Sequence, residues 1–410
     1  MTKRTLEPTL LLALGVSVFW VVMAGWSDGL GRLGIATYGM VFLDSYAVMA
    51  ALDAMRAGLD PHAANALDPL LRYHVYSDWW LALKWTGLGR AQNFIVGIAW
   101  VTAFGFAAWS TARPRTWREA LWLTVILISP PVLLAVVRGN NDLVIFVLLA
   151  LCGVALAGNG GGKLRWLLAL VGIGLATGLK YYPAVAVIMF LWIRPVRLIP
   201  MRLGCAVLVA GLALASVWPD LRRVPANVQG GIHTMGAAVW WRDLGWTDAQ
   251  AAVPGLLLLA VVGTGFALSR FTAGLAARGE VRERLLAALS AVTMLACFVS
   301  TVNFAYRWIF VVWIALWAWR RAGENLPSRE RWAARSACGL IFICVWADGI
   351  LCVVVNGLSP KSPDWIEHLL LTYRAWTQPL YWLLMAMFAG WLLEGVLSTV
   401  REWRQQRSSA

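Results

Sequence analysis

The chain has 410 residues, of which 60% are hydrophobic and 14% charged, and its formal net charge is +14. So high an apolar content excludes a water-soluble globular protein and indicates a membrane protein. In a soluble protein this positive charge would suggest a nucleic-acid partner. Here the distribution of Lys and Arg between the apolar runs indicates the topology of the chain in the membrane instead.

Twelve apolar runs predict an all-α fold, a polytopic transmembrane helix bundle that forms a single membrane domain over residues 1–410. The first run follows Lys3-Arg4, is too long for a signal-peptide core and has no small-residue cleavage site after it, so we expect a retained anchor. Runs shorter than the roughly 20 residues that cross hydrocarbon are expected inside the bundle. The expected spans are 8–26, 92–110, 119–137, 142–158, 165–179, 182–193, 203–218, 251–269, 285–301, 304–319, 336–355 and 377–400.

The basic residues predict how these spans are oriented. If the spans alternate from a cytoplasmic N-terminus, the cytoplasmic segments carry the whole net charge of +14 and the opposite face is close to neutral. An excess of Lys and Arg in cytoplasmic loops is typical of membrane proteins. We therefore expect a multi-pass protein of a bacterial-type plasma (inner) membrane, with an even number of spans and both termini cytoplasmic.

Three long outer segments are expected at residues 27–91, 219–250 and 356–376, and function usually concentrates in such loops. In the first loop, residues 45–57 favour a helix that Gly58 ends, and this pattern predicts an amphipathic helix lying on the outer membrane face. Trp79 and Trp80 fall in the same loop, where an indole suits the headgroup level. Pro183 predicts a break between the fifth and sixth spans.

The unusual polar residues gather at the outer ends of spans and in the outer loops. Lys180 and Arg307 are embedded in apolar sequence, where an ionisable residue marks a candidate functional site. Arg grips a phosphate with two hydrogen bonds and Lys offers a point charge. With a carboxylate to accept a proton from a hydroxyl, this set suits transfer from a lipid-linked phosphate donor. The candidates are Asp44, Asp60, His62, Arg138, Asn140, Asn141, Asp142, Lys180, Tyr181, Trp240, Arg242, Tyr306 and Arg307.

Structural roles stay open for these residues. The sequence has no nucleophile elbow, Walker A loop, dinucleotide-type glycine fingerprint or HExxH. The six cysteines lie in apolar runs without CxxC spacing and are interpreted as small buried side chains. Asp44 could cap a helix, Lys180 could snorkel to the headgroups, and Arg307 and Trp240 could be interface anchors. Asn140-Asn141-Asp142 could form a tight turn, and His62 could have a structural role. Asp348 lies inside a span and is expected in a buried hydrogen-bonded pair.

The order of the short motifs resembles the GT-C glycosyltransferases, in particular glycosyltransferase family 87. The matching elements are Asp44-Ser45-Tyr46 with Gly58-Leu59-Asp60-Pro61-His62, then Arg138-Gly139-Asn140-Asn141-Asp142 before a span, Gly178-Leu179-Lys180-Tyr181-Tyr182-Pro183, and in the second half mainly Tyr306-Arg307. The chain departs from the family pattern where His62 replaces Tyr, Asn140-Asn141 replaces Gln-x-Asn, and Tyr76-Ser77-Asp78-Trp79-Trp80 replaces Tyr-x-Pro-Pro.

This resemblance implies an inverting transferase that moves a sugar, commonly mannose, from a polyprenyl-phosphate carrier to a lipid or glycan acceptor on the outer face. It implies Asp44 as the general base and Lys180 as a ligand of the donor phosphate. No cofactor is expected, although Asp44, Asp60 and Asp142 could share a divalent metal. We expect Arg307 and Tyr181 as further donor-phosphate ligands and Asp60, His62, Asn140, Asn141, Asp142, Trp240, Arg242 and Tyr306 as substrate-binding residues.

A transporter or flippase of a lipid-linked sugar is the main alternative function. It would also need about twelve spans and a cation that binds phosphate. The sequence shows no half-to-half repeat, and its polar residues gather at one face instead of the midplane. A noncatalytic scaffold would not need clustered aspartates in long loops. The expected partners are the sugar donor, the acceptor and membrane lipids, with no nucleic acid.

Overall fold

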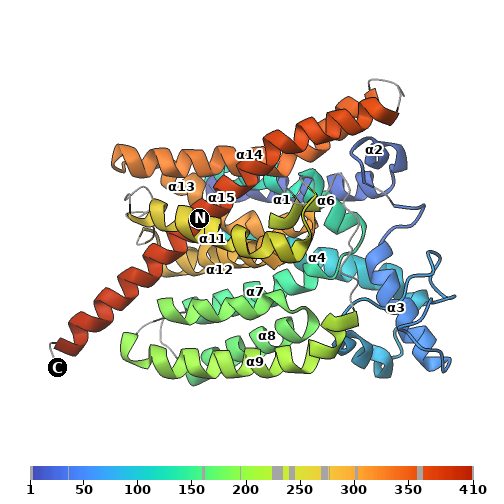
Figure 1. Cartoon of the computed structure of the whole chain (residues 1–410), viewed down its shortest axis with the longest axis horizontal. Helices are drawn as coiled ribbons and strands as arrows, with labels where there is room; N and C mark the ends of the chain where they lie inside the picture. The colour runs from blue at the N-terminus through green and yellow to red at the C-terminus, as the bar shows by residue number, and fades with distance from the viewer. Residues whose placement is uncertain are drawn as a thin grey trace.

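The computed structural model describes residues 3–35, 37–158, 162–193, 195–223, 234–239, 245–268, 276, 278–300, 303–357 and 363–408. Within these ranges the chain is an all-helical bundle apart from one antiparallel pair of two-residue strands. The helices run back and forth along the long axis, and both termini lie away from α2 and α3 (Figure 1). We call the end that holds α3 the α3 end, and the end where α4 and α7 finish, beside Arg113 and Arg165, the basic end.

The elements follow in chain order. They are α1 (Lys3–Ala24), α2 (Ser27–Arg32), α3 (Leu43–Arg56), η1 (Asp78–Thr86), η2 (Arg90–Gln92), α4 (Asn93–Ala112), α5 (Trp117–Leu127), α6 (Pro130–Val137), α7 (Asp142–Ala157), α8 (Lys163–Leu179), η3 (Tyr182–Trp192), η4 (Val196–Leu198), α9 (Ile199–Arg223), β1 (Thr234–Met235), α11 (Asp248–Leu268), α12 (Val281–Ser300), β2 (Asn303–Phe304), η5 (Ala305–Val311), α13 (Val312–Gly323), α14 (Ser328–Gly357) and α15 (Pro363–Ser408).

All twelve predicted spans coincide with helical segments, so the chain is a multi-pass helical membrane protein. Among the described residues, six helices are long and apolar enough to cross a membrane alone, and three shorter apolar helices accompany them. The predicted span 119–137 is a bent pair, because α5 and α6 meet at 63°. Pro130 and Pro131 open α6 and supply no backbone N–H to continue the ladder of α5.

The break predicted at Pro183 is confirmed. Helix α8 ends at Leu179, and the chain continues after Lys180 as the 3₁₀ segment η3, with Pro183 in its first turn. The turn between them therefore carries Lys180 at the end of one apolar helix and at the start of the next. This turn lies at the α3 end, because α8 begins at Lys163 on the basic end.

The helix predicted in the first loop exists as α3, and Gly58 follows it with a positive φ of 74°. Its place on the membrane surface stays a prediction, but its apolar face is covered by protein. The apolar face of α3 forms a buried cluster in which Met49 and Leu52 pack with Trp80 and Leu81 of η1. Trp80 itself is buried and its Nε1 donates to the carbonyl of Leu179 at 3.2 Å, so this indole is core instead of a headgroup anchor.

The other two long loops are partly regular structure. Residues 363–376, expected in the third loop, form the beginning of α15, whose 46 residues extend about 69 Å. In the second, Thr234 pairs with Phe304 and Met235 with Asn303, which ties the segment to the turn before η5. All six cysteines are free, and five are buried while Cys205 is half-buried.

Candidate functional site

The candidate site lies at the α3 end, where several helices begin or finish. Asp44 is in the first turn of α3, Asp142 opens α7, Lys180 follows α8 and Arg307 lies in η5. Because these helices alternate in direction, residues far apart in sequence meet at one end of the bundle. Asp44 and Asn140, for instance, are 96 positions apart and are hydrogen-bonded.

Asp44 is buried and its carboxylate is held by a clamp from the α6–α7 turn. Arg138 donates from Nε to both carboxylate oxygens at 3.1 Å and from Nη2 to Oδ1 at 2.6 Å. Asn140 donates from Nδ2 to Oδ2 at 2.6 Å. The guanidinium of Arg72 lies 3.8 Å from Oδ1. No side chain caps α3, so helix capping is not the role of Asp44.

The surroundings of Asp44 lower the pKa of its carboxyl below the usual value. Burial alone would raise this pKa, because a buried carboxylate loses its hydration. The charge and hydrogen bonds of Arg138, the bond from Asn140 and the charge of Arg72 outweigh that effect. Asp44 is therefore ionised at neutral pH, as a proton acceptor must be.

Asp142 gathers two cations at the start of α7. Its Oδ1 accepts a hydrogen bond from Nζ of Lys180 and one of 2.6 Å from the hydroxyl of Tyr182. The Nε atom of Arg307 lies 3.8 Å from Oδ2, which makes an ion pair but not a hydrogen bond. The side chain of Asp142 is fully buried, so two cations and one anion lie together with little access to water. A second anion would balance this group.

Arg307 keeps free hydrogen-bonding capacity. Its Nε and Nη1 atoms are buried and have no hydrogen-bond partner among the described residues. The guanidinium carbon lies 4.9 Å from the centroid of the Tyr182 ring, within the range of a cation–π contact. Buried guanidinium donors without partners are costly unless a ligand or water fills them. Two buried donors of Arg307 are therefore left unused by the described residues.

The two aspartates are joined through Asn140. Asn140 donates to Asp44 and accepts, through Oδ1, a hydrogen bond of 2.9 Å from the backbone nitrogen of Asp142. Asn141 is fully buried, yet neither atom of its amide has a partner among the described residues. We name Asp44, Arg138, Asn140, Asp142, Lys180 and Arg307 the carboxylate–cation cluster. Asn141 lies directly beside it in the chain.

Aromatic rings surround Lys180. Its Nζ atom lies 5.7 Å from the ring centroid of Tyr306 and 5.9 Å from that of Tyr76. The hydroxyl of Tyr181 lies 3.5 Å from Oγ of Ser300. Of the expected phosphate ligands, the structure therefore brings Lys180 and Arg307 onto Asp142, whereas the hydroxyl of Tyr181 contacts Ser300.

Asp60 and His62 form a separate group. Asp60 is exposed and its carboxylate accepts from the backbone of His62 at 2.9 Å, which is a turn-forming contact. His62 lies 3.2 Å from Asp78 and 3.0 Å from Nη1 of Arg223 through its Nε2. Trp240 and Arg242 lie outside the described residues, so the structure does not place them.

Four residues of the site were not predicted in their observed roles. Arg138 was expected only as a phosphate ligand and is the partner of Asp44, while Tyr182 was quoted in a motif and is the partner of Asp142. Tyr76, beside Lys180, gave no signal beyond its place in a divergent motif. Arg72 gave no signal in the sequence. It donates a hydrogen bond of 2.8 Å to the carbonyl of Leu43, and its guanidinium lies near Asp44.

No metal site is apparent in the part of the chain that the structure describes. Within it, no three His, Cys, Asp or Glu side chains converge as metal ligands would. The carboxylates of Asp44 and Asp142 are paired with cations, and the carboxylate of Asp60 accepts a hydrogen bond from the backbone of His62. Asp348, the carboxylate inside a span, accepts hydrogen bonds from Tyr373 at 2.7 Å and Tyr381 at 3.3 Å, so its predicted buried pairing is confirmed.

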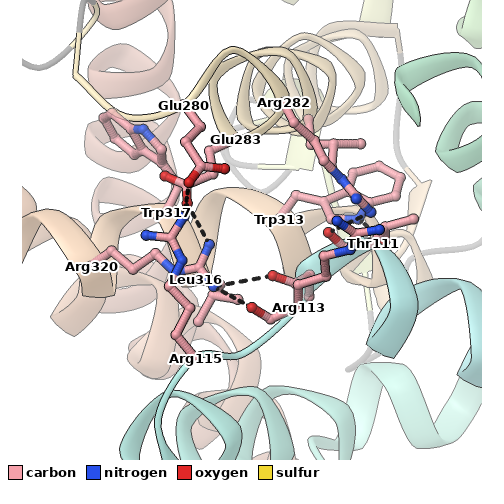
Figure 2. Close-up of a pocket in the computed structure, with 12 residues that line it drawn as sticks. Thr111, Arg113, Arg115, Glu280, Arg282, Glu283, Trp313, Leu316, Trp317 and Arg320 are labelled. Atoms are coloured by element: carbon pink, nitrogen blue, oxygen red, sulfur yellow. Dashed lines mark hydrogen bonds and ion pairs between the residues drawn. The ribbon is translucent and has the colours of Figure 1, made fainter. Parts of the chain in front are cut away.

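Within the described residues, three cavities lie at the basic end, and the smallest of them shares lining residues with each of the other two. One of about 450 Å³ is drawn in Figure 2, which shows Arg115 and Arg320 beside Glu280 and Glu283. Another, of about 960 Å³, runs between α7, α8 and the start of α12. Arg165 and Lys180 bracket α8, so the two ends are separated by about 22 Å along this helix. The charged rim of these cavities is therefore distinct from the carboxylate–cation cluster, while the apolar lining of the largest cavity extends along α8 to Leu175.

Comparison with known proteins gives little for function. No family model and no curated protein matches the chain. Among solved structures, the chain has a distant similarity to ArnT from Cupriavidus metallidurans in the apo state, at 12% identity and a TM-score of 0.36, over 94% of this chain and 78% of that chain. A similarity of this extent establishes neither a common fold nor a common activity. The function must be argued from the cluster and the motifs.

Proposed function

We propose that this protein is a membrane-embedded glycosyltransferase that transfers a sugar from a polyprenyl-phosphate carrier to a lipid or glycan acceptor. The observation that carries the proposal is the pair of buried cations on Asp142. Lys180 and Arg307 share this one carboxylate, and Arg307 retains two donors without partners. One phosphate oxygen pair would fill those donors and balance the excess positive charge.

The position of these cations suits a lipid-borne phosphate. Lys180 and Arg307 are at the ends of apolar helical segments, where the headgroup of a lipid meets protein. A polyprenyl chain would then lie along the bundle in the hydrocarbon, with its phosphate at the cluster. A soluble nucleotide sugar would need no such placement. This argument favours a lipid-linked donor.

Asp44 is proposed as the base that accepts the proton of the acceptor hydroxyl. Its carboxylate is ionised, but its pair with Arg138 makes it a weak base in the unliganded state. A donor phosphate that recruits Arg138 would loosen this pair and raise the pKa of Asp44, which strengthens it as a base. Donor binding would thus prepare Asp44 for catalysis.

The proposed reaction is a single displacement. The acceptor oxygen attacks the anomeric carbon as Asp44 takes its proton, and the bond between that carbon and the lipid phosphate oxygen breaks. The phosphate leaves as an anion paired with Lys180 and Arg307, so no general acid is needed. One carboxylate therefore suffices where glycoside hydrolysis uses two. Displacement from the opposite face inverts the anomeric configuration.

We also propose that the sugar is mannose and that the reaction takes place at the outer face of the inner membrane. Both rest on the motif order that resembles glycosyltransferase family 87 and on the clustering of Lys and Arg away from the α3 end. The departure at Asn140-Asn141 lies in and beside the carboxylate–cation cluster, and the departure at His62 lies in the separate group with Asp60. They are the positions at which we expect a different sugar or acceptor preference to arise.

The proposal is tested by sugar transfer from synthetic polyprenyl-phosphate mannose in membranes that contain the wild-type chain, with host lipid extract as acceptor. We expect a new glycosylated product from the wild type and at least a hundredfold less from Asp44→Asn, given the usual contribution of a general base of about 10²–10⁴-fold. Asp28→Asn is the matched control, because Asp28 is an exposed acid of α2.

Both variants must appear in the membrane at the wild-type level. Equal product from Asp44→Asn and the wild type would exclude Asp44 as the base while leaving a transferase. No product from any form, with other polyprenyl-phosphate sugars also inactive, would contradict the transferase proposal. The transporter alternative predicts that the labelled lipid crosses a bilayer unchanged.

A further inference from the structure

Two of the cavities at the basic end, of about 450 Å³ and 960 Å³, meet at a common rim. Arg113, Glu280 and Arg282 line both of them. Beyond this rim the larger cavity continues as a groove between α7 and α8, with an apolar lining that includes Leu151, Leu168 and Val171. A polar chamber that opens into an apolar groove has the polarity pattern of an amphiphile. The groove is lined along α8 from Arg165 to Leu175, about 15 Å, which is half the thickness of a hydrocarbon core.

The groove is open to the membrane. Leu151, Leu168 and Val171 are exposed by 62%, 55% and 49%. Such side chains face acyl chains in a bilayer instead of water. A lipid chain that lies in the groove would therefore contact these residues without first displacing a part of the protein.

Most charges of the smaller cavity are already paired. Glu283 accepts from Arg115, from Arg320 at 2.9 Å and from Arg321 at 3.3 Å. Arg320 also binds Glu119 at 2.8 Å, and Arg115 binds Glu280 at 2.7 Å. These contacts form a compact ion network that closes one side of the cavity (Figure 2).

Arg113 and Arg282 differ from the other arginines at the rim. Within the described part of the chain, neither forms an ion pair. Arg282 donates to the carbonyl of Ser110 at 2.9 Å and of Thr111 at 3.3 Å, on the side of the cavity away from Arg320 (Figure 2). Its buried Nε has no hydrogen-bond partner there. The rim therefore carries two arginines outside the ion pairs of the described residues, at the mouth of an apolar groove. Glu280, which pairs with Arg115, also attracts Arg282.

We infer that this rim and groove bind an anionic glycerophospholipid, with its phosphate on Arg113 and Arg282 and one acyl chain between α7 and α8. Basic pockets between membrane helices commonly recognise anionic lipid headgroups. The site lies at the opposite end from the carboxylate–cation cluster and does not depend on the function proposed for that cluster. The phospholipid would link the ends of α4, α7, α8 and α12 and stabilise the bundle.

The test uses the purified full-length chain, delipidated in detergent, with phosphatidylglycerol and phosphatidylcholine of identical acyl chains. Native mass spectrometry measures bound lipid, and the midpoint of thermal unfolding measures its effect. We expect one tightly held phosphatidylglycerol per chain and a rise of the midpoint that phosphatidylcholine does not reproduce. The double variant Arg113→Gln/Arg282→Gln should weaken this binding by roughly fivefold per arginine removed.

Three controls separate the site from general effects of charge and folding. Arg404→Gln removes a charge from the exposed end of α15, outside both cavities, and should bind like the wild type. Arg113→Lys/Arg282→Lys keeps both charges and should recover most of the affinity. Val171→Trp leaves every charge in place but fills the groove, and it should weaken phosphatidylglycerol binding.

Several results would overturn the inference. Equal stabilisation by the two phospholipids would indicate unspecific solvation by lipid. The same stabilisation by inorganic phosphate would indicate a small-anion site, and a clear preference for polyprenyl phosphate would indicate a donor-lipid site. Binding that is unchanged in the glutamine double variant would exclude the rim as the headgroup site.

Discussion

The side-chain amide of Asn140 donates a hydrogen bond of 2.6 Å to the carboxylate of Asp44. Through its oxygen, the same amide accepts from the backbone of Asp142 at 2.9 Å, so one residue sets the position of the proposed base relative to the carboxylate that holds Lys180. The proposed donor site and the proposed base are thus parts of one connected structure.

Replacement of Asn140 by Ala should reduce sugar transfer without preventing membrane insertion. The change removes one donor to a buried carboxylate, a contact worth about 1.5–3 kcal/mol, and it frees Asp44 to move relative to Asp142. We expect a fall in kcat of roughly ten- to a hundredfold, measured with saturating donor. Asn65→Ala is a useful comparison, since Asn65 is a buried loop asparagine outside the cluster. Full activity of Asn140→Ala would show that the link has no catalytic role.

Arg138→Met should move the acid limb of the rate–pH profile to higher pH. Arg138 is the main group that lowers the pKa of Asp44, and without it the effect of burial raises that pKa. A base that must be ionised then loses its proton only at higher pH, and the acid limb of kcat/KM reports this directly.

Arg138→Lys serves as the control for Arg138→Met, because it retains the charge and should produce a smaller shift. A profile that keeps its shape while its height falls would indicate a purely structural role for Arg138. A lower rate with an unchanged pH profile would mean that less protein is folded, whereas a shifted profile would mean that the pKa of the base has changed.

Asp142→Asn should destabilise the protein and make it dependent on an added anion. The change leaves Lys180 and Arg307 buried without their counter-charge, and breaking a buried ion pair in this way costs about 3–5 kcal/mol. We expect a midpoint of thermal unfolding several degrees below that of the wild type, with partial recovery when polyprenyl phosphate is added. Recovery that is no greater than in the wild type would argue against a phosphate site at these cations.

Acidification should weaken the first loop through His74. Burial lowers the pKa of His74 from 6.5 to about 4, against the raising effects of its bond to Ser77 and of Asp78 and Asp220, while His62 lowers it further. The unfolded state binds the proton more readily, so stability is fully present above pH 6.5 and is lost as the pH falls towards 4.

The measurement for His74 is the midpoint of thermal unfolding between pH 7.5 and pH 4 in detergent. His74→Gln retains a donor for the carbonyl of Ser77 but cannot be protonated, so its midpoint should depend less steeply on pH than that of the wild type. Parallel curves for the two proteins would show that another group is responsible.

The sequence predicted the helical fold well, because apolar runs and their flanking charges are local signals. Each predicted span coincides with a helical segment, and the break at Pro183 follows from the chemistry of proline. The bend at Pro130 was not predicted, although two consecutive prolines are a signal for it. The packing of α3 against η1 was not predicted. An amphipathic pattern does not reveal whether lipid or a segment such as η1 covers the apolar face.

The candidate site was predicted as a set of residues but not as a set of contacts. Lys180 and Arg307 were expected to converge, since each is a charge in apolar sequence at the same predicted face. That Asp142 would hold them both, and that Arg138 would clamp Asp44, depends on how the helix ends are rotated about their axes. Hydrophobic periodicity in spans apolar on most faces does not fix this rotation.

The central claim is that the chain cleaves a sugar from a lipid phosphate, and it is tested most directly with doubly labelled donor. Proteoliposomes that contain the wild-type chain would receive polyprenyl-phosphate mannose labelled separately in the sugar and in the phosphate, together with acceptor lipid. The account predicts that labelled sugar appears on the acceptor in a one-to-one ratio with free labelled polyprenyl phosphate. Movement of both labels together across the bilayer, with the sugar–phosphate bond intact, would contradict it.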